Sequence, residues 1–143
     1  MTDQLAAGQK AALEHARYLA ENGVPLFLAK PDLDSDGEWR PSGGHQSTGY
    51  WLPPRWQQTV ADPGVVDRWK PGMALGAVLG GLLDLFDADP RGGSAASIAL
   101  MTAAGLVPRS YGRATTPSEG THDLIATLGL RSLDKVYPGV DIK

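Results

Sequence analysis

Residues 82–89, LLDLFDAD, decide the fold of this chain because they join a strand pattern to a pair of acids. The apolar run predicts a strand over 82–88. Side chains alternate between the two faces of a strand, so Asp87 and Asp89 share one face and Asp84 lies on the other. Two carboxylates about 7 Å apart at a strand end repel each other unless a cation lies between them, and such oxygen ligands suit Mg²⁺ or Mn²⁺. The alternative is that the acids provide solubility and start a turn before the following proline.

Helices and strands are predicted on both sides of this run. Gly80-Gly81 would join two neighbouring strands as a hairpin. Gly23 and Gly105 would end helices, and Ser94 would cap one. The elements expected around residues 82–88 are helices over residues 5–22, 63–69 and 94–104 and strands over residues 24–29, 73–79, 111–115, 122–128 and 140–142. This order predicts an α+β fold with a largely antiparallel sheet and helices against one face.

Length and composition limit the class of protein. A chain of 143 residues predicts one domain, with an α/β part over residues 1–70 and a sheet part over residues 71–143. The absence of cysteine excludes a disulfide framework, a thiolate zinc site and a cysteine nucleophile. The net charge of −3 excludes a strongly basic nucleic-acid arm. The sequence shows no signal peptide and no apolar window long enough for a membrane span, so no membrane partner and a cytoplasmic location are expected.

Two further residues could belong to a site with the acid pair. His122 opens a strand after a loop of serine, glycine and threonine, and an imidazole beside hydroxyl and backbone N–H groups could hold a phosphate. The alternative is an ordinary surface histidine at a strand start. Asp141 lies between two β-branched residues and points to the face opposite them, which means little in isolation.

Taken in order, these pieces resemble the bifunctional DNA primase/polymerase (prim-pol) domain of the archaeo-eukaryotic primase superfamily, over nearly the whole chain. No single piece is specific, and the resemblance depends on five pieces in the right order. The matching pieces are Val24-Pro25-Leu26 with Lys30-Pro31, the tryptophan-containing helix at residues 65–69, the acid strand at residues 82–90, the loop and histidine at residues 115–122, and Gly139-Val140-Asp141-Ile142-Lys143.

The resemblance implies a prim-pol fold with an RRM-like catalytic sheet and an enzyme that makes and extends primers on a DNA template from nucleoside triphosphates. Replication of a plasmid, phage or prophage would be its setting, with a helicase as a further partner. The resemblance also implies a two-metal site for Mg²⁺ or Mn²⁺, formed by Asp87, Asp89 and Asp141. The residues implied for the nucleotide are His122, Ser118 and Gly120, with Lys30, Arg113 and Lys143 as further phosphate or template contacts.

Three departures from the family pattern qualify these roles. Glu119 stands where the family usually has glycine, and its charge would lie beside the triphosphate. Asp123 replaces an apolar residue after the histidine. Lys143 ends the sequence where the family continues with further strands, so we expect a fold truncated at its C-terminal end, a second chain that completes it, or a domain completed by self-association.

Two other functions remain open. The first is a catalytically inert or incomplete prim-pol-like module that binds nucleic acid and needs a partner chain. The second is a phosphatase similar to the haloacid dehalogenases, with Asp87 as nucleophile and Asp89 as acid/base. That pattern requires threonine or valine two residues after the second acid, where this chain has Arg91.

Overall fold

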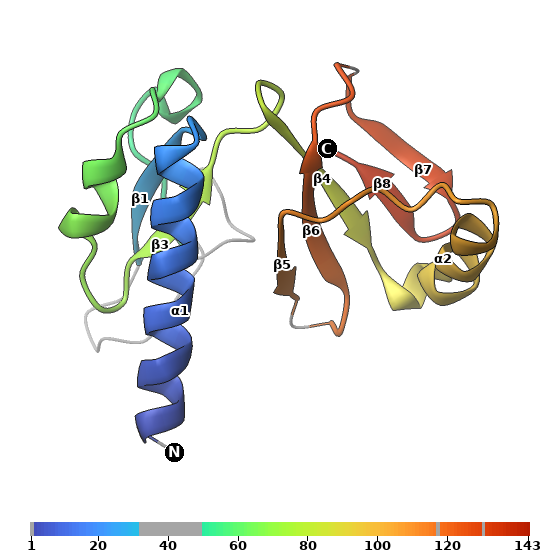
Figure 1. Ribbon diagram of the computed structural model, residues 1–143, viewed down its shortest axis with the longest axis horizontal. Helices are drawn as coiled ribbons and strands as arrows, with labels where there is room; N and C mark the ends of the chain where they lie inside the picture. Colours follow the sequence, from blue (N-terminus) through green and yellow to red (C-terminus); the bar gives the residue numbers. More distant parts are fainter. Residues whose placement is uncertain (1, 32–49, 117, 130) are drawn as a thin grey trace. The chain divides into compact units, whose positions relative to one another are not determined.

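The computed structural model of the protein describes residues 2–31, 50–116, 118–129 and 131–143 (Figure 1). The chain falls into two compact units that divide between Val78 and Leu79. Both units contain helical segments and an antiparallel sheet, so the expected α+β class is confirmed.

The N-terminal unit, unit 1, packs a long helix and a short 3₁₀ helix with a three-stranded sheet. The sheet has the order β2-β1-β3, and both pairings are antiparallel. Its core is built from the C-terminal half of the helix, the first strand and the 3₁₀ helix: Ala16, Leu19, Ala20, Val24, Leu26, Phe27, Ala29, Val65 and Val66 are buried. The elements are α1 (Thr2–Glu21), β1 (Leu26–Pro31), β2 (Tyr50–Trp51), η1 (Trp56–Gln58), η2 (Pro63–Arg68) and β3 (Ala74–Ala77).

The predicted hairpin around Gly80-Gly81 is wrong. Strand β3 pairs with β1 in unit 1, whereas the acid strand belongs to unit 2. A run of alternating residues marks a strand but does not name its partner. The close approach of β1 also explains Gly76, because a Cβ there would lie 2.3 Å from the ring of Phe27.

The C-terminal unit, unit 2, carries a five-stranded antiparallel sheet with the order β5-β6-β4-β8-β7. The strands expected over 82–88, 111–115 and 122–128 are present with slightly different ends, and the one expected over 140–142 has the predicted ends, whereas β7 was not predicted. The expected helix over 94–104 is also present, but Gly93 is its N-cap instead of Ser94. The elements are β4 (Leu83–Ala88), η3 (Pro90–Gly92), α2 (Ser94–Ala103), β5 (Gly112–Thr115), β6 (Thr121–Ala126), β7 (Leu133–Tyr137) and β8 (Val140–Ile142).

The two faces of the β4–β6–β8 sheet differ in chemistry. One face packs against Met101 of α2 and forms the core of unit 2. The alternate residues of β4, which include Asp87, therefore lie on the face that α2 does not cover. The buried members of this core are Phe86, Ala88, Met101, Ile125 and Val140.

Asp84 lies on the core side of β4 and serves the fold. It is 3% exposed, and its carboxylate accepts hydrogen bonds from the backbone N–H of Leu128 at 2.8 Å and the hydroxyl of Thr127 at 3.2 Å. These bonds compensate for the loss of water around a buried carboxylate. Asp84 thus holds the residues that follow β6 against β4. Asp87 lies on the opposite face of β4.

Candidate functional site

Asp87 lies on the central strand, β4, between two polar residues of the neighbouring strands. It is directly opposite His122 of β6 on one side and Asp141 of β8 on the other. Directly opposite residues of antiparallel strands point to the same face. The register therefore brings together three of the residues expected at the metal and nucleotide site, although they are up to 54 positions apart in the sequence, from 87 to 141.

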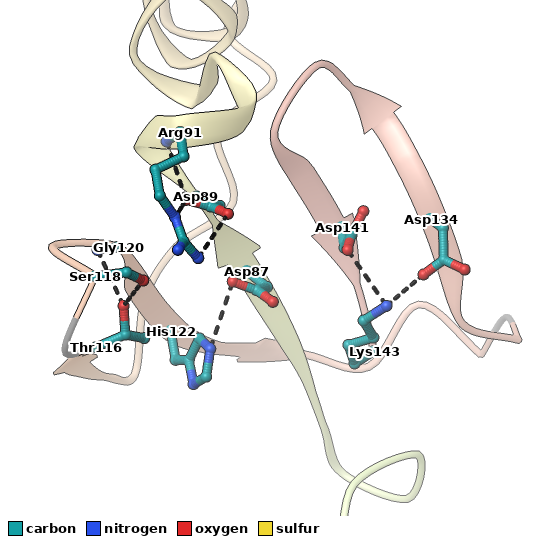
Figure 2. Close-up of polar contacts among 10 residues, drawn as sticks. All are labelled: Asp87, Asp89, Arg91, Thr116, Ser118, Gly120, His122, Asp134, Asp141 and Lys143. Carbon is teal, nitrogen blue, oxygen red and sulfur yellow. Dashed lines mark hydrogen bonds and ion pairs between the residues drawn. The ribbon is translucent and has the colours of Figure 1, made fainter. Parts of the chain in front are cut away.

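The two neighbours of Asp87 stand at different spacings. Leu85 and Lys143 exchange both backbone hydrogen bonds, at 2.8 and 2.9 Å, so Asp87 and Asp141 form the next hydrogen-bonded pair. Such pairs have Cα atoms about 5.5 Å apart, whereas the non-hydrogen-bonded Asp87–His122 pair has a spacing of about 4.5 Å. The histidine is therefore the closer partner, and His122 Nε2 lies 3.4 Å from Asp87 Oδ1 (Figure 2).

Asp89 follows on the same face but is used as a cap. Its Oδ1 accepts the backbone N–H of Arg91 at 3.0 Å, which starts η3. The guanidinium of Arg91 also lies against both carboxylate oxygens, at 3.3 and 3.4 Å. The side-chain bond from Arg91, followed by its backbone bond, lowers the pKa of Asp89.

Asp141 is held by the outer strand and by the lysine two residues after it. Its Oδ1 accepts the backbone N–H of Lys135 at 2.6 Å, and its Oδ2 lies 3.3 Å from Lys143 Nζ. The Lys135 bond is the main cause of a lowered pKa for Asp141, and Lys143 contributes in the same direction. Lys143 also contacts Asp134 of β7 closely, and chiefly for that reason its own pKa is raised (Figure 2).

The loop before His122 is closed by its own polar groups. The hydroxyl of Thr116 accepts the N–H of Gly120 at 3.0 Å and hydrogen-bonds to the hydroxyl of Ser118 at 3.2 Å. The N–H of Glu119 is donated to the carbonyl of Thr116. Ser118 therefore stands near the strand that carries His122, but the N–H groups of residues 119 and 120 are already bonded within the loop.

Glu119 adopts a left-handed backbone with φ 62°. This region costs an L-residue about 1–2 kcal/mol but costs glycine little. The resemblance placed a glycine at this position, and the backbone of the loop supplies a physical reason for one.

Replacing Glu119 by glycine is expected to raise the free energy of unfolding by about 0.5–1 kcal/mol, because relief of the left-handed strain exceeds the added entropy of the unfolded chain. Glu119→Gln keeps the side chain and removes only the charge, so it should leave the unfolding free energy unchanged. Urea denaturation of the three proteins measures the difference. Equal stability of the glycine and glutamine variants would show that the backbone at 119 carries no strain.

Of the remaining expected contacts, Lys30 belongs to the other unit, and Arg113 does not join this group. Lys30 lies on β1 of unit 1, opposite Trp51. Arg113 is the register neighbour of Asp123 on β6, one position before the Ala114–His122 pair, and so faces the opposite side of the sheet from His122. Its Nε donates to Asp123 Oδ1 at 2.8 Å. Arg113 therefore serves an ion pair on the α2 side of unit 2.

The Arg113–Asp123 pair gives the sheet a predictable acid sensitivity. Burial acts to raise the pKa of Asp123, but hydrogen bonds from Arg113, Ser110 and Thr121 outweigh it, and the pKa is lowered. A carboxyl with a depressed folded-state pKa stabilises the protein above its unfolded pKa, and this contribution is lost as the pH falls through the folded value.

Asp123→Asn is therefore expected to cost about 2 kcal/mol of unfolding free energy at pH 6, the size of a charge-assisted hydrogen bond, and progressively less below pH 4. Denaturant titrations at several pH values measure this. Asp67→Asn, which removes an exposed partner of Arg17, is the matched control and should change little at any pH. A cost for Asp123→Asn that stays constant down to pH 2 would contradict the linkage.

Asp87 and Asp141 have the right chemistry for one hard cation. Two carboxylates directly opposite each other on one face repel, and a divalent ion that prefers oxygen ligands relieves that repulsion. Asp89 could join them only by giving up its cap and Arg91. In the structure each of the three acids faces a basic group of its own chain, and no three His, Asp or Glu side chains in the described residues are grouped so that they could hold a metal ion.

Two residues near the acids were missed by sequence reasoning as part of this group. Arg91 was considered only for its misfit to a phosphatase pattern, although an aspartate before proline commonly starts a turn in which its carboxylate accepts the N–H of the residue two positions on, here Arg91. Nothing in the sequence placed Asp134 near this group, because residues 133–137 were not expected to form a strand. The Pro138-Gly139 turn before residues 140–142 could have indicated that β7 and β8 form a hairpin.

Comparisons with known proteins leave the site to be judged on its own geometry. Among the described residues, no helix is both long and apolar enough to cross a bilayer. A scan against protein-family models, a search of curated proteins and a search of solved structures each returned no match to this chain.

Proposed function

We propose that this protein is a metal-dependent nucleotidyltransferase with a prim-pol fold, which makes and extends primers on a DNA template during replication. One observation carries the proposal: the register that sets Asp87 between His122 and Asp141 on the face of the unit 2 sheet that α2 does not cover. This group consists of the acids and the histidine that the resemblance assigns to the metal and nucleotide site. The cytoplasmic setting, the plasmid or phage origin and a helicase or second chain as partner belong to the same proposal.

Asp87 and Asp141 would hold the ion in this reaction, with Asp89 as a third ligand for a second ion. Mg²⁺ or Mn²⁺ would neutralise charge on the attacking hydroxyl, the α-phosphate and the leaving oxygen of an in-line displacement. His122 Nε2 lies 3.4 Å from the carboxylate of Asp87, and its other ring nitrogen would face a nucleotide phosphate. Ser118, from the adjoining loop, offers a hydroxyl to the same phosphates.

Primer synthesis on single-stranded DNA with nucleoside triphosphates and Mg²⁺ or Mn²⁺ tests this function directly. Wild type should give metal-dependent products, and Asp87→Ala and Asp141→Ala should give none. Asp89→Ala distinguishes a metal ligand from a residue that only caps η3. If Asp89 is only a cap, the substitution should lower stability and leave most of the activity. Equal product from wild type and Asp87→Ala would exclude the proposed chemistry.

The second candidate function is a nucleic-acid-binding module with the same fold and no catalysis. The pairing of each acid with a basic group of the chain favours it, as does the charge of Glu119 within the loop that would hold the triphosphate. Calorimetric titration with a nucleoside triphosphate and Mn²⁺ separates the two functions. Metal-dependent nucleotide binding that Asp87→Asn removes favours the enzyme, whereas DNA binding without nucleotide binding favours the module.

A further inference from the structure

The ammonium group of Lys143 forms ion pairs with two different acids. It follows β8, and its Nζ lies 3.3 Å from Asp141 Oδ2 and in close contact with Asp134 Oδ1 of β7 (Figure 2). Its side chain is 38% exposed, whereas that of Asp134 is 72% exposed and that of Asp141 is 31% exposed. The ammonium thus joins an acid of the candidate site to an acid at the rim of the sheet.

The backbone fixes this position. Lys143 exchanges both of its backbone hydrogen bonds with Leu85 of β4, so it lies on the same strand face as Asp141 and Asp87. Asp141 is itself held by the N–H of Lys135, at 2.6 Å. The ammonium of Lys143 can therefore move while Asp141 stays in place, because a lysine has a flexible four-carbon side chain and the carboxylate of Asp141 is held by a backbone hydrogen bond.

We infer that Lys143 is a built-in competitor of the metal ion: its ammonium contacts both Asp141 and Asp134 when no ion is bound, and keeps only the contact with Asp134 when an ion takes the carboxylate of Asp141. This inference rests on the proposed function, because it takes Asp141 as a metal ligand. It adds a role for Asp134, which already contacts the ammonium, holds it when an ion binds Asp141, and so lowers the cost of metal entry. Lys143 is in this sense a positioning residue that sets how tightly the metal binds.

The role of Asp134 makes the inference specific. If Lys143 merely added positive charge to the neighbourhood, Asp134 and Lys143 would act on the metal independently, and their effects would add. If Lys143 competes for Asp141, Asp134 acts only through Lys143, and removing the lysine should cancel the effect of the second substitution. A double-mutant cycle distinguishes these two cases.

Mn²⁺ binding, followed by the loss of the free-ion signal in electron paramagnetic resonance, tests the inference without any activity measurement. Lys143→Met should tighten the Kd for Mn²⁺ about fivefold, which is the scale of an exposed ion pair. Asp134→Asn should weaken binding about twofold to threefold in the wild-type background and leave it unchanged in the Lys143→Met background. Lys143→Arg should resemble wild type.

Two controls separate this inference from the proposed function. Lys135→Met removes the same charge from the neighbouring strand without touching the carboxylate of Asp141, so it should change the Kd much less than Lys143→Met. Asp87→Asn should abolish binding in every background. Equal effects of Lys135→Met and Lys143→Met, or additive effects of Asp134→Asn, would overturn the competition while metal binding remained. Mn²⁺ binding that Asp87→Asn leaves unchanged, or no binding by wild type and Lys143→Met alike, would overturn the metal site itself.

Discussion

Asp87→Asn is expected to reduce template-directed nucleotide incorporation by about 10³-fold or more. The substitution keeps the shape of the side chain and removes the charge that would hold the metal. Asp87 is the central member of the group, with His122 and Asp141 directly opposite it, so no neighbouring carboxylate can replace it without a change of register. The measurement is single-turnover primer extension at saturating Mn²⁺.

The same variant should fold at least as well as wild type. Asp87 is half-buried on a face that α2 does not cover, and its loss relieves repulsion from the acid directly opposite. Thermal unfolding of Asp87→Asn checks this point. Asp67→Asn, an identical chemical change on an exposed residue of unit 1, is the matched control and should keep full activity. Retention of more than a tenth of the activity by Asp87→Asn would rule out its role as a metal ligand.

Gly139→Ala is expected to destabilise unit 2 by about 3 kcal/mol, because both the backbone angle and the space around Gly139 require glycine. Its φ is +72°, and a Cβ there would lie 2.6 Å from the carbonyl oxygen of Asp89 and 2.6 Å from the N–H nitrogen of Ser94. Both are backbone atoms, so β8 would have to move away from the end of β4. The displacement would carry Asp141 with it.

Gly105→Ala is the matched control for this variant. Gly105 has a similar φ of +69°, but a Cβ there would meet nothing within 4 Å. The control should therefore cost about 1 kcal/mol, the strain of the left-handed backbone alone. Denaturant unfolding measures both variants. Equal losses would show that the turn between β7 and β8 relaxes without strain on β4, and that β8 is less firmly held than the contacts at Gly139 indicate.

The strands of unit 2 could be predicted largely because their sequences alternate and end in turn residues. Parity alone placed Asp84 on the opposite face from Asp87, and the structure confirms this with a 3% exposed Asp84. Strand β7 was not predicted because the adjacent Asp134 and Lys135 interrupt any alternation of its apolar residues. It is largely exposed and lies at the edge of the sheet, where neither face imposes a hydrophobic pattern. The false hairpin at Gly80-Gly81 arose because pairing is decided by the tertiary structure.

The set of residues that form the candidate site was harder to predict from the sequence. The shared face of Asp87 and Asp89 follows from spacing, but their meeting with His122 and Asp141 depends on how β6 and β8 align with β4. That alignment is a long-range property, and only the order of pieces in the family resemblance indicated it. Arg113 shows the same limit: the sequence offers a basic residue nine positions before His122, and only the β5–β6 register reveals that it turns to the other side.

The central place of β4 also determines which changes in chain length this protein can tolerate. Residues added between β5 and β6 or between β6 and β7 would lengthen a connection and leave β4, β6 and β8 aligned. One residue gained or lost inside β4 would instead turn the strand over, so that Phe86 and Ala88 would point outward and Asp87 would enter the apolar layer beneath α2. Homologous chains should therefore vary in length between these strands and keep a constant number of residues within them.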